Sequence, residues 1–187
     1  MRVIEALPFL ADLKDRVSFA HQTGARDREQ VEKGYAAVGF APDVREFITD
    51  MSAAYSGTDL VVCRAGATTL AELTVCKKPS ILIPFPAAAD NHQVVNARSL
   101  VDAGAAVMIE ERDLTGELLA SEMRRVLLDP AVRDRMARAA GRLGRPQAAS
   151  EIADVLTQLT VRRWGTPKGR ARPPGFAPVR PPTAGPK

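Results

Sequence analysis

The sequence predicts an α/β fold in which helices flank a parallel β-sheet. Short runs of aliphatic and β-branched residues alternate with longer segments of helical periodicity, a pattern typical of βαβ units. The run Leu60–Cys63 contains no alternating polar residue, which indicates a strand covered on both faces. A chain of 187 residues is long enough for one domain with its own core. We therefore expect a single Rossmann-like domain over residues 1–160.

The expected elements follow one another in a regular order. The expected strands are Val17–Ala20, Val44–Phe47, Leu60–Cys63, Ser80–Ile83 and Ala106–Ile109. The expected helices are Arg2–Lys14, Arg26–Ala37, Met51–Tyr55, Ala67–Lys77, Asp90–Asp102, Thr115–Leu128, Ala131–Leu143 and Gln147–Leu159. The sequence opens on a helix, whereas a doubly wound domain normally opens on a strand followed by a phosphate-binding loop. We therefore expect the first strand and its phosphate loop to be missing.

The last part of the sequence differs in composition from the rest. Residues 161–187 hold seven of the 26 basic residues, none of the 22 acidic ones and seven of the 14 prolines. Residues 1–160 therefore carry 19 basic and 22 acidic residues, and this mildly acidic part has no nucleic-acid footprint. We expect residues 161–187 to be a basic, proline-rich tail. It should be disordered from residue 163 on, because its apolar surface is too small to offset the entropy of ordering.

Cysteine use and hydropathy restrict the class of protein further. The two cysteines, Cys63 and Cys76, lie in apolar segments and form no C-x-x-C pair, so neither a zinc site nor a disulfide framework is predicted. A reducing, cytoplasmic setting is expected. The apolar stretch Ser80–Ala89 is interrupted by two prolines and is shorter than the ~20 residues that span a bilayer. Acidic residues near the N-terminus argue against a signal peptide.

The segment after the third expected strand has the composition of a phosphate site. The small residues that follow Arg64 permit close approach of the backbone, and a helix beginning near Ala67 offers N–H groups and the positive end of its dipole. Glu72 lies roughly 7.5 Å further along the helix axis, about the offset from a diphosphate to the ribose of the same nucleotide. Its carboxylate can accept from both ribose hydroxyls. Thr69 and Glu72 also have the spacing of a capping box, and that alternative stays open.

Another polar loop follows the fourth expected strand. Two prolines hold this loop extended and lead to Asn91, His92 and Gln93 at a helix start. Amide and imidazole groups of this kind recognise sugar hydroxyls. Asp90 and Gln93 also have the spacing of a helix cap, so a purely structural role remains an alternative.

The ends of the first two expected strands carry further candidates. His21 is a candidate general base, but no carboxylate is placed to orient it, so a structural role is favoured. The backbone of Ile48 can pair with the edge of a flat base, although the segment also resembles an ordinary strand exit with Asp50 as a helix N-cap. The sequence holds no Ser/His/Asp set, metal-ligand cluster or D-x-D motif. It therefore predicts no catalytic residue, metal or cofactor.

Four of these segments form a series with fixed order and spacing. They are His21–Gly24 (H-Q-[ST]-G), Phe47–Met51 (F-I-x-D-M), Cys63–Glu72 (C-R-[AS]-G-A-x-T-x-x-E) and Pro84–Ala97 (P-[FY]-P, then D-x-x-Q-x-x-N-A). Each segment is weak evidence alone. Together, over residues 1–160, they resemble the MurG family of cell-wall N-acetylglucosaminyltransferases in glycosyltransferase family 28. The resemblance implies the C-terminal, donor-binding half of a GT-B fold, which is built from two Rossmann-like domains.

The resemblance implies a ligand and a set of residues that bind it. The implied donor is UDP-N-acetylglucosamine, with Ile48 presenting its backbone to uracil, Glu72 holding the ribose and Gln93 reaching the sugar. The residues implied to cradle the diphosphate are Ala67, Thr68, Thr69 and Leu70, with Thr23 nearby. The helix dipole would assist the departure of UDP, so no metal is needed.

The resemblance also implies an N-terminal domain, which residues 1–160 do not supply. In the family, the N-terminal domain carries the acceptor site for the lipid-linked muramyl-pentapeptide, the membrane-facing patch and the expected catalytic base. We therefore expect a truncated form that binds donor only and is soluble by itself, although the family is peripheral at the inner face of the cell membrane. The alternatives are a donor-binding subunit that needs a separate N-terminal-half chain, and a non-catalytic nucleotide-binding module.

Overall fold

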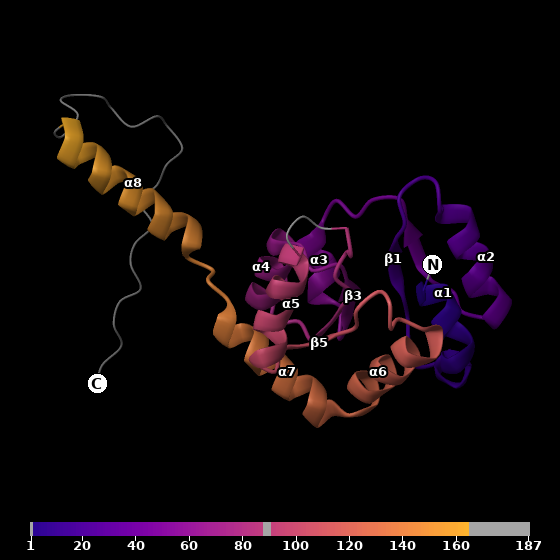
Figure 1. The fold of residues 1–187 in the computed structure, drawn as a ribbon. Helices are drawn as coiled ribbons and strands as arrows, with labels where there is room; N and C mark the ends of the chain where they lie inside the picture. The colour runs from indigo at the N-terminus through magenta and orange to yellow at the C-terminus, as the bar shows by residue number, and fades with distance from the viewer. Residues whose placement is uncertain (1, 88–90, 165–187) are drawn as a thin grey trace. The chain divides into compact units, whose positions relative to one another are not determined.

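The computed structural model describes residues 2–87 and 91–164 (Figure 1). The chain divides after Pro146 into two units, and helix α8 (Ala148–Trp164) belongs to the second unit. The domain boundary expected at residue 160 therefore falls inside α8. All five strands of the described residues lie in the first unit, which also contains every candidate site residue.

The first unit contains short parallel strands in two groups. The strands are β1 (Ala20–Gln22), β2 (Asp43–Arg45), β3 (Val61–Cys63), β4 (Ser80–Leu82) and β5 (Ala106–Met108). Among the described residues, β1 pairs with β2, while β3, β4 and β5 form a sheet with β4 in the middle. The predicted α/β architecture with parallel strands is confirmed, but the strands form two sheets rather than one.

The strands of the second sheet lie where the sequence predicts them, whereas those of the first are displaced. β1 begins at Ala20, the last residue of the expected strand, and β2 ends at Arg45 rather than Phe47. Pairing begins where the Asp43 N–H donates to the Phe19 carbonyl at 2.7 Å. Val17 still packs against the core without pairing. The apolar run Val17–Ala20, which suggested a strand, therefore indicates burial of its side chains rather than strand pairing.

Helices cover both faces of the strands. They are α1 (Arg2–Ala6), α2 (Arg28–Val38), α3 (Met51–Ser56), α4 (Ala67–Val75), α5 (His92–Asp102), α6 (Gly116–Leu128) and α7 (Pro130–Leu143), with a 3₁₀ helix η1 (Leu7–Leu13) after α1. The single helix expected over Arg2–Lys14 is therefore divided. Pro8 explains the division, because its ring has no N–H and clashes with the carbonyl of the preceding turn.

Two clusters of buried side chains hold the layers together. Ile81 and Leu82, successive residues of β4, point to opposite faces and are both 0% exposed. The cluster around Ile81 includes residues of η1, α2 and α6. The cluster around Leu82 includes residues of α4, α5 and α7. In Figure 1, α3, α4 and α5 accordingly lie together on one side of the unit, with α1 and α2 on the other.

The first helix packs against a helix that is distant in sequence. Gly116, at the start of α6, lies so close to the backbone of Glu5 that a side chain there would collide with it. Asp12 accepts two hydrogen bonds from Arg124, from Nη1 at 2.6 Å and Nη2 at 3.0 Å, across 112 positions of sequence. The N-terminal segment is thus fixed by residues from the last third of the unit.

Helix α8 extends further than the sequence predicts. It ends at Trp164, so residues 163 and 164, expected in the disordered tail, are helical, and the rest of that tail lies outside the described residues. Extending an existing helix needs no new nucleation, which favours continuation past Leu159. Four apolar side chains of α8 are exposed: Ile152, Val155, Leu156 and Leu159. Among the described residues, no helix is long and apolar enough to cross a membrane.

Candidate functional site

The candidate residues follow the carboxyl ends of β1 to β4, where ligands bind in open parallel sheets. Thr23 follows β1, Ile48 follows β2, the residues of α4 follow β3, and Gln93 comes after the loop that leaves β4. The structure links these positions through side-chain contacts in two places. One lies at the ends of β1 and β2, the other at the ends of β3 and β4.

The start of α4 presents unbonded backbone N–H groups. Gly66 is the N-cap, and no side chain caps the helix. The first N–H groups of a helix have no partner within it, but Leu70 already donates to the Gly66 carbonyl at 3.0 Å. The donors left for an anion are therefore those of Ala67, Thr68 and Thr69. Leu70 is instead a buried core residue, 5% exposed.

Glu72 is held by a tyrosine from another helix. The Tyr55 hydroxyl donates to the Glu72 carboxylate at 3.1 Å, and burial together with this carboxylate raises the pKa of Tyr55. The capping-box alternative is wrong, because α4 begins at Ala67 behind its N-cap Gly66, so Thr69 lies inside the helix. Glu72 is half-buried and fixed in direction, with further capacity to accept hydrogen bonds.

Gln93 joins the loops that follow β3 and β4. Its Oε1 accepts from the backbone N–H of Ala65 at 3.2 Å and from that of Phe85 at 3.0 Å. One helical turn on, Asn96 donates to the Ala65 carbonyl at 3.3 Å. The observed N-cap of α5 is Asn91, and Asp90, proposed as the alternative cap, lies outside the described residues. Gln93 therefore has a structural contact through its oxygen, and its amide NH₂ retains two donors.

The ends of β1 and β2 are joined through Gln22. The Ile48 N–H, predicted to face uracil, donates to Oε1 of Gln22 at 2.8 Å. Thr23 donates through Oγ1 to the Gly24 carbonyl at 2.7 Å. Asp50 is the N-cap of α3, as expected, and accepts from the Ala53 N–H at 2.9 Å. A base could reach the Ile48 N–H only by displacing the exposed Gln22 side chain.

His21 has the surroundings of a structural residue. Its Nδ1 lies 3.2 Å from the Tyr35 hydroxyl, and the two rings pack edge to face. Partial burial lowers the pKa of His21, which favours the neutral imidazole. These contacts support the structural interpretation over that of a general base.

Arg64 is a functional candidate that the sequence alone did not single out. Its guanidinium donates to the carbonyls of Ile83 and Pro84 at 3.2 and 3.3 Å, pairs with Glu111, and lies 5.5 Å from the centre of the Phe85 ring. A cavity of about 390 Å³ adjoins it. The lining residues are Arg2, Val3, His21, Gln22, Thr23, Asp27, Val31 and Arg64. The position of Arg64 directly after the apolar strand β3 was the available signal.

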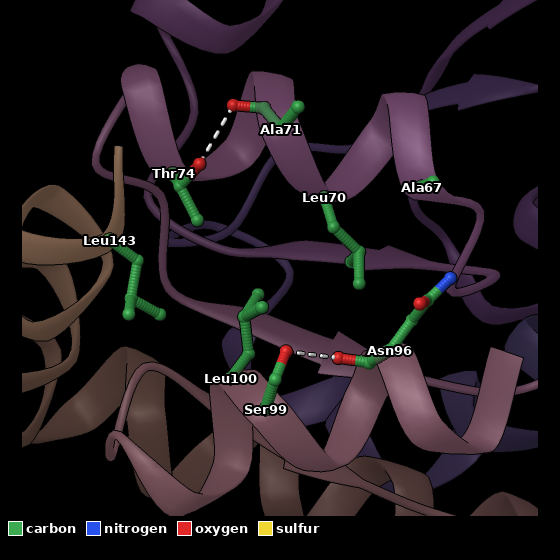
Figure 2. Close-up of a pocket in the computed structure, with 8 residues that line it drawn as sticks. All are labelled: Ala67, Leu70, Ala71, Thr74, Asn96, Ser99, Leu100 and Leu143. Atoms are coloured by element: carbon green, nitrogen blue, oxygen red, sulfur yellow. Dashed lines mark hydrogen bonds between the residues drawn. The ribbon is translucent and has the colours of Figure 1, made fainter. Parts of the chain in front are cut away.

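A second cavity, of about 310 Å³, lies between α4, α5 and the end of α7 (Figure 2). Its lining contains no charged side chain, and the hydroxyls of Thr74 and Ser99 are bonded to the carbonyls of Ala71 and Asn96. Ala67 and Leu70 line this cavity, but Glu72 and Gln93 do not. Its chemistry does not suit a diphosphate. Among residues 2–87 and 91–164, no group of His, Cys, Asp and Glu side chains could hold a metal ion.

Comparison with curated proteins gives close relatives. The chain is 78% identical over 182 residues to the UDP-N-acetylglucosamine–N-acetylmuramyl-(pentapeptide) pyrophosphoryl-undecaprenol N-acetylglucosamine transferase of Anaeromyxobacter sp. (strain K). It is 61% identical over 173 residues to the protein of the same name from Myxococcus xanthus (strain DK1622). These alignments cover 97% and 92% of this chain but 48% and 45% of the relatives. The chain thus spans about half the length of the curated relatives it matches.

Comparison with solved structures and family models agrees with this. The crystal structure of Acinetobacter baumannii MurG superposes with a TM-score of 0.75 at 31% identity, covering 84% of this chain and 46% of that one. The model of the glycosyltransferase family 28 C-terminal domain matches residues 1–156. The fold and the uncapped start of α4 agree with these matches. The chain therefore belongs to glycosyltransferase family 28, and it is a C-terminal domain of the MurG type.

Proposed function

We propose that this chain binds UDP-N-acetylglucosamine at the carboxyl ends of β1 to β4 and is the donor-binding half of an N-acetylglucosaminyltransferase. One observation carries the proposal: an uncapped helix start, at Ala67, is followed along the same helix by a carboxylate whose direction Tyr55 fixes. N–H groups at a helix start suit phosphate. A half-buried carboxylate at the position of Glu72 suits the two hydroxyls of a ribose.

The site residues divide the donor between them. Ala67, Thr68 and Thr69 offer backbone N–H groups to the diphosphate, and Leu70 fixes the helix through its buried side chain. Glu72 holds the ribose, and Gln93 uses its amide NH₂ on the sugar while its oxygen keeps the two loops together. Ile48 pairs with uracil after Gln22 moves aside, and Thr23 lies beside the diphosphate. This division gives each predicted site residue except Leu70 one part of the ligand.

The chemical step would rest on electrostatics. Transfer of the sugar leaves an additional negative charge on the β-phosphate of UDP, and the dipole at the start of α4 favours that charge. We assign no catalytic residue to this chain. The acceptor, the lipid-linked muramyl-pentapeptide, would bind polypeptide outside these residues, whether in the same chain or in a separate partner. The assembled enzyme would act at the inner face of the cell membrane.

Isothermal titration calorimetry tests the donor proposal. The chain is titrated with UDP-N-acetylglucosamine, and with UDP, UDP-glucose and GDP as controls. Tighter binding of UDP-N-acetylglucosamine than of UDP-glucose or GDP supports the proposal. Equal binding of all uridine nucleotides would indicate a nucleotide-binding module without sugar selection, and no binding by a folded chain would contradict the donor assignment.

A further inference from the structure

Arg64 connects the carboxyl ends of three neighbouring strands. It follows β3 directly, and its Nη1 donates to the carbonyls of Ile83 and Pro84, just beyond the end of β4, at 3.2 and 3.3 Å. The same nitrogen pairs with Glu111, which lies beyond the end of β5. A side chain that follows β3 thus fixes the course of the chain where it leaves β4.

Phe85, the next residue after these carbonyls, is held from two sides. The Arg64 guanidinium lies 5.5 Å from the centre of the Phe85 ring, a distance typical of a cation–π contact. The backbone N–H of Phe85 donates to Oε1 of Gln93 at 3.0 Å. Phe85 is 48% exposed, so packing in the core does not fix its position. Phe85 is therefore the link between Arg64 and Gln93.

The side-chain amide of Gln93 combines a structural contact with a proposed ligand contact. Its Oε1 accepts from the N–H groups of Ala65 and Phe85, and its NH₂ is the group proposed to reach the sugar. Because the amide is planar, the two contacts of the oxygen also set the direction of the NH₂. If the chain shifts where it leaves β4, the Phe85 N–H moves and the amide turns with it. The direction of the two donors therefore depends on Arg64.

We propose that Arg64 is a positioning residue for the sugar part of the donor and acts through Phe85 and Gln93. This inference rests on the proposed function, in which Gln93 reaches the sugar. The alternative, a contact of Arg64 with the diphosphate, is disfavoured because the Arg64 charge is already paired with Glu111. Lysine could not replace Arg64, because it lacks the planar guanidinium and its ammonium ends one bond short of the position of Nη1.

Isothermal titration calorimetry of the full chain with UDP and UDP-N-acetylglucosamine tests this inference. UDP lacks the sugar, so a change in the ratio of the two Kd values between variant and parent reports the sugar contact. In Arg64→Ala, the Kd of UDP-N-acetylglucosamine should rise about 3- to 10-fold relative to that of UDP, the effect of one lost hydrogen bond. Arg64→Lys should show the same change while keeping the charge. Arg98→Ala, which removes an exposed arginine of α5, is the matched control and should leave the ratio unchanged.

The variant Gln93→Glu tests the route of the effect. It keeps an oxygen for the N–H groups of Ala65 and Phe85 but removes the NH₂ donors, so by itself it should raise the ratio by a similar factor. Adding Arg64→Lys to Gln93→Glu should change the ratio no further, because two residues that act through one contact are not additive. Additive effects of the two substitutions would overturn the route through Gln93.

The remaining outcomes separate this inference from the proposed function. An unchanged ratio in both Arg64 variants, with folding checked by thermal melts, would overturn the inference. Equal weakening of both nucleotides would also overturn it, since Arg64 would then act on the diphosphate or on the fold as a whole. If Arg64→Ala does not fold, Arg64→Lys decides between these results. A folded parent that binds neither nucleotide would instead contradict the proposed function.

Discussion

The β4 and β1 strands belong to the same unit, yet their side chains have different surroundings. All three residues of β4 are buried, because strands flank it on both sides and helices cover both faces. In β1 only His21 is half-buried, and its neighbours are exposed. A strand that is buried on all sides can be recognised in the sequence, because its own residues are apolar. The bounds of an edge strand depend on the strand with which it pairs, and the local sequence does not show that partner.

The largest expected effect is on stability, and it tests whether the two sheets differ as strongly as their burial suggests. Ile81→Ala should lower the free energy of unfolding by about 2–5 kcal/mol, because Ile81 is fully buried and truncation leaves a cavity. Val44→Ala, in β2, should cost about 1 kcal/mol, because Val44 is only partly buried. Urea unfolding followed by circular dichroism measures both. Equal losses would show that the first sheet is as tightly packed as the second.

The next effect concerns ligand binding at the second sheet. Glu72→Ala should weaken UDP binding by about 1.5–3 kcal/mol, the value of a hydrogen bond to a charged group. Glu117→Ala, an exposed carboxylate in the first turn of α6, serves as the matched control and should leave affinity unchanged. Calorimetry with both variants and a thermal melt for folding completes the test. Unchanged affinity in Glu72→Ala would remove the ribose role from Glu72.

Two tyrosines, one beside each sheet, allow the same comparison with a smaller expected effect on stability. Tyr55→Phe removes the hydroxyl that holds Glu72, and Tyr35→Phe removes the one beside His21. Each should lower stability by about 0.5–1.5 kcal/mol, the net value of a hydrogen bond. Only Tyr55→Phe should also weaken UDP binding, because Tyr35 contacts no proposed ligand residue of the second sheet. A similar loss of affinity in both variants would mean that the effect is not specific to the orientation of Glu72.

The smallest effect is a pH dependence located in the first sheet. Burial lowers the pKa of His21 below its ordinary value of 6.5, so the folded state binds a proton less readily than the unfolded one. Stability from this residue is therefore complete above about pH 6.5 and is lost as the pH falls below that value towards the folded-state pKa. Unfolding from pH 7.5 down to pH 5 should show this slope in the parent, but less of it in His21→Gln. An identical slope in both proteins would place the titrating group elsewhere.

Much of the fold was predictable because its elements depend on local pattern. The strands β3, β4 and β5 are continuous apolar runs, and their starts and ends fall within one residue of the expected ones. The break between α1 and η1 was not predicted, although Pro8, which cannot continue a helix, was the available signal. The separation into two sheets could not be predicted in this way, because it depends on which strands pair.

The candidate site was predictable in its positions but not in its contacts. The sequence placed Glu72 and Gln93 correctly after β3 and β4, whereas the hydroxyl of Tyr55 and the two N–H groups that Gln93 accepts come from other loops and helices. The capping box failed because a Thr-x-x-Glu spacing does not show where the helix begins. Arg64 was missed because its carbonyl partners become neighbours only when β3 and β4 pair. The ligand roles of these residues stay predictions until binding is measured.

The packing of the first helix against α6 has a consequence for biosynthesis. Asp12 is synthesised before its partner Arg124, which follows 112 residues later. At about 5–20 residues per second, the nascent chain carries an uncovered apolar segment, η1 with its neighbours, for roughly 6 to 22 seconds. Chaperones that bind emerging apolar segments would have that interval to act on residues 2–13, and slower translation before α6 would lengthen it.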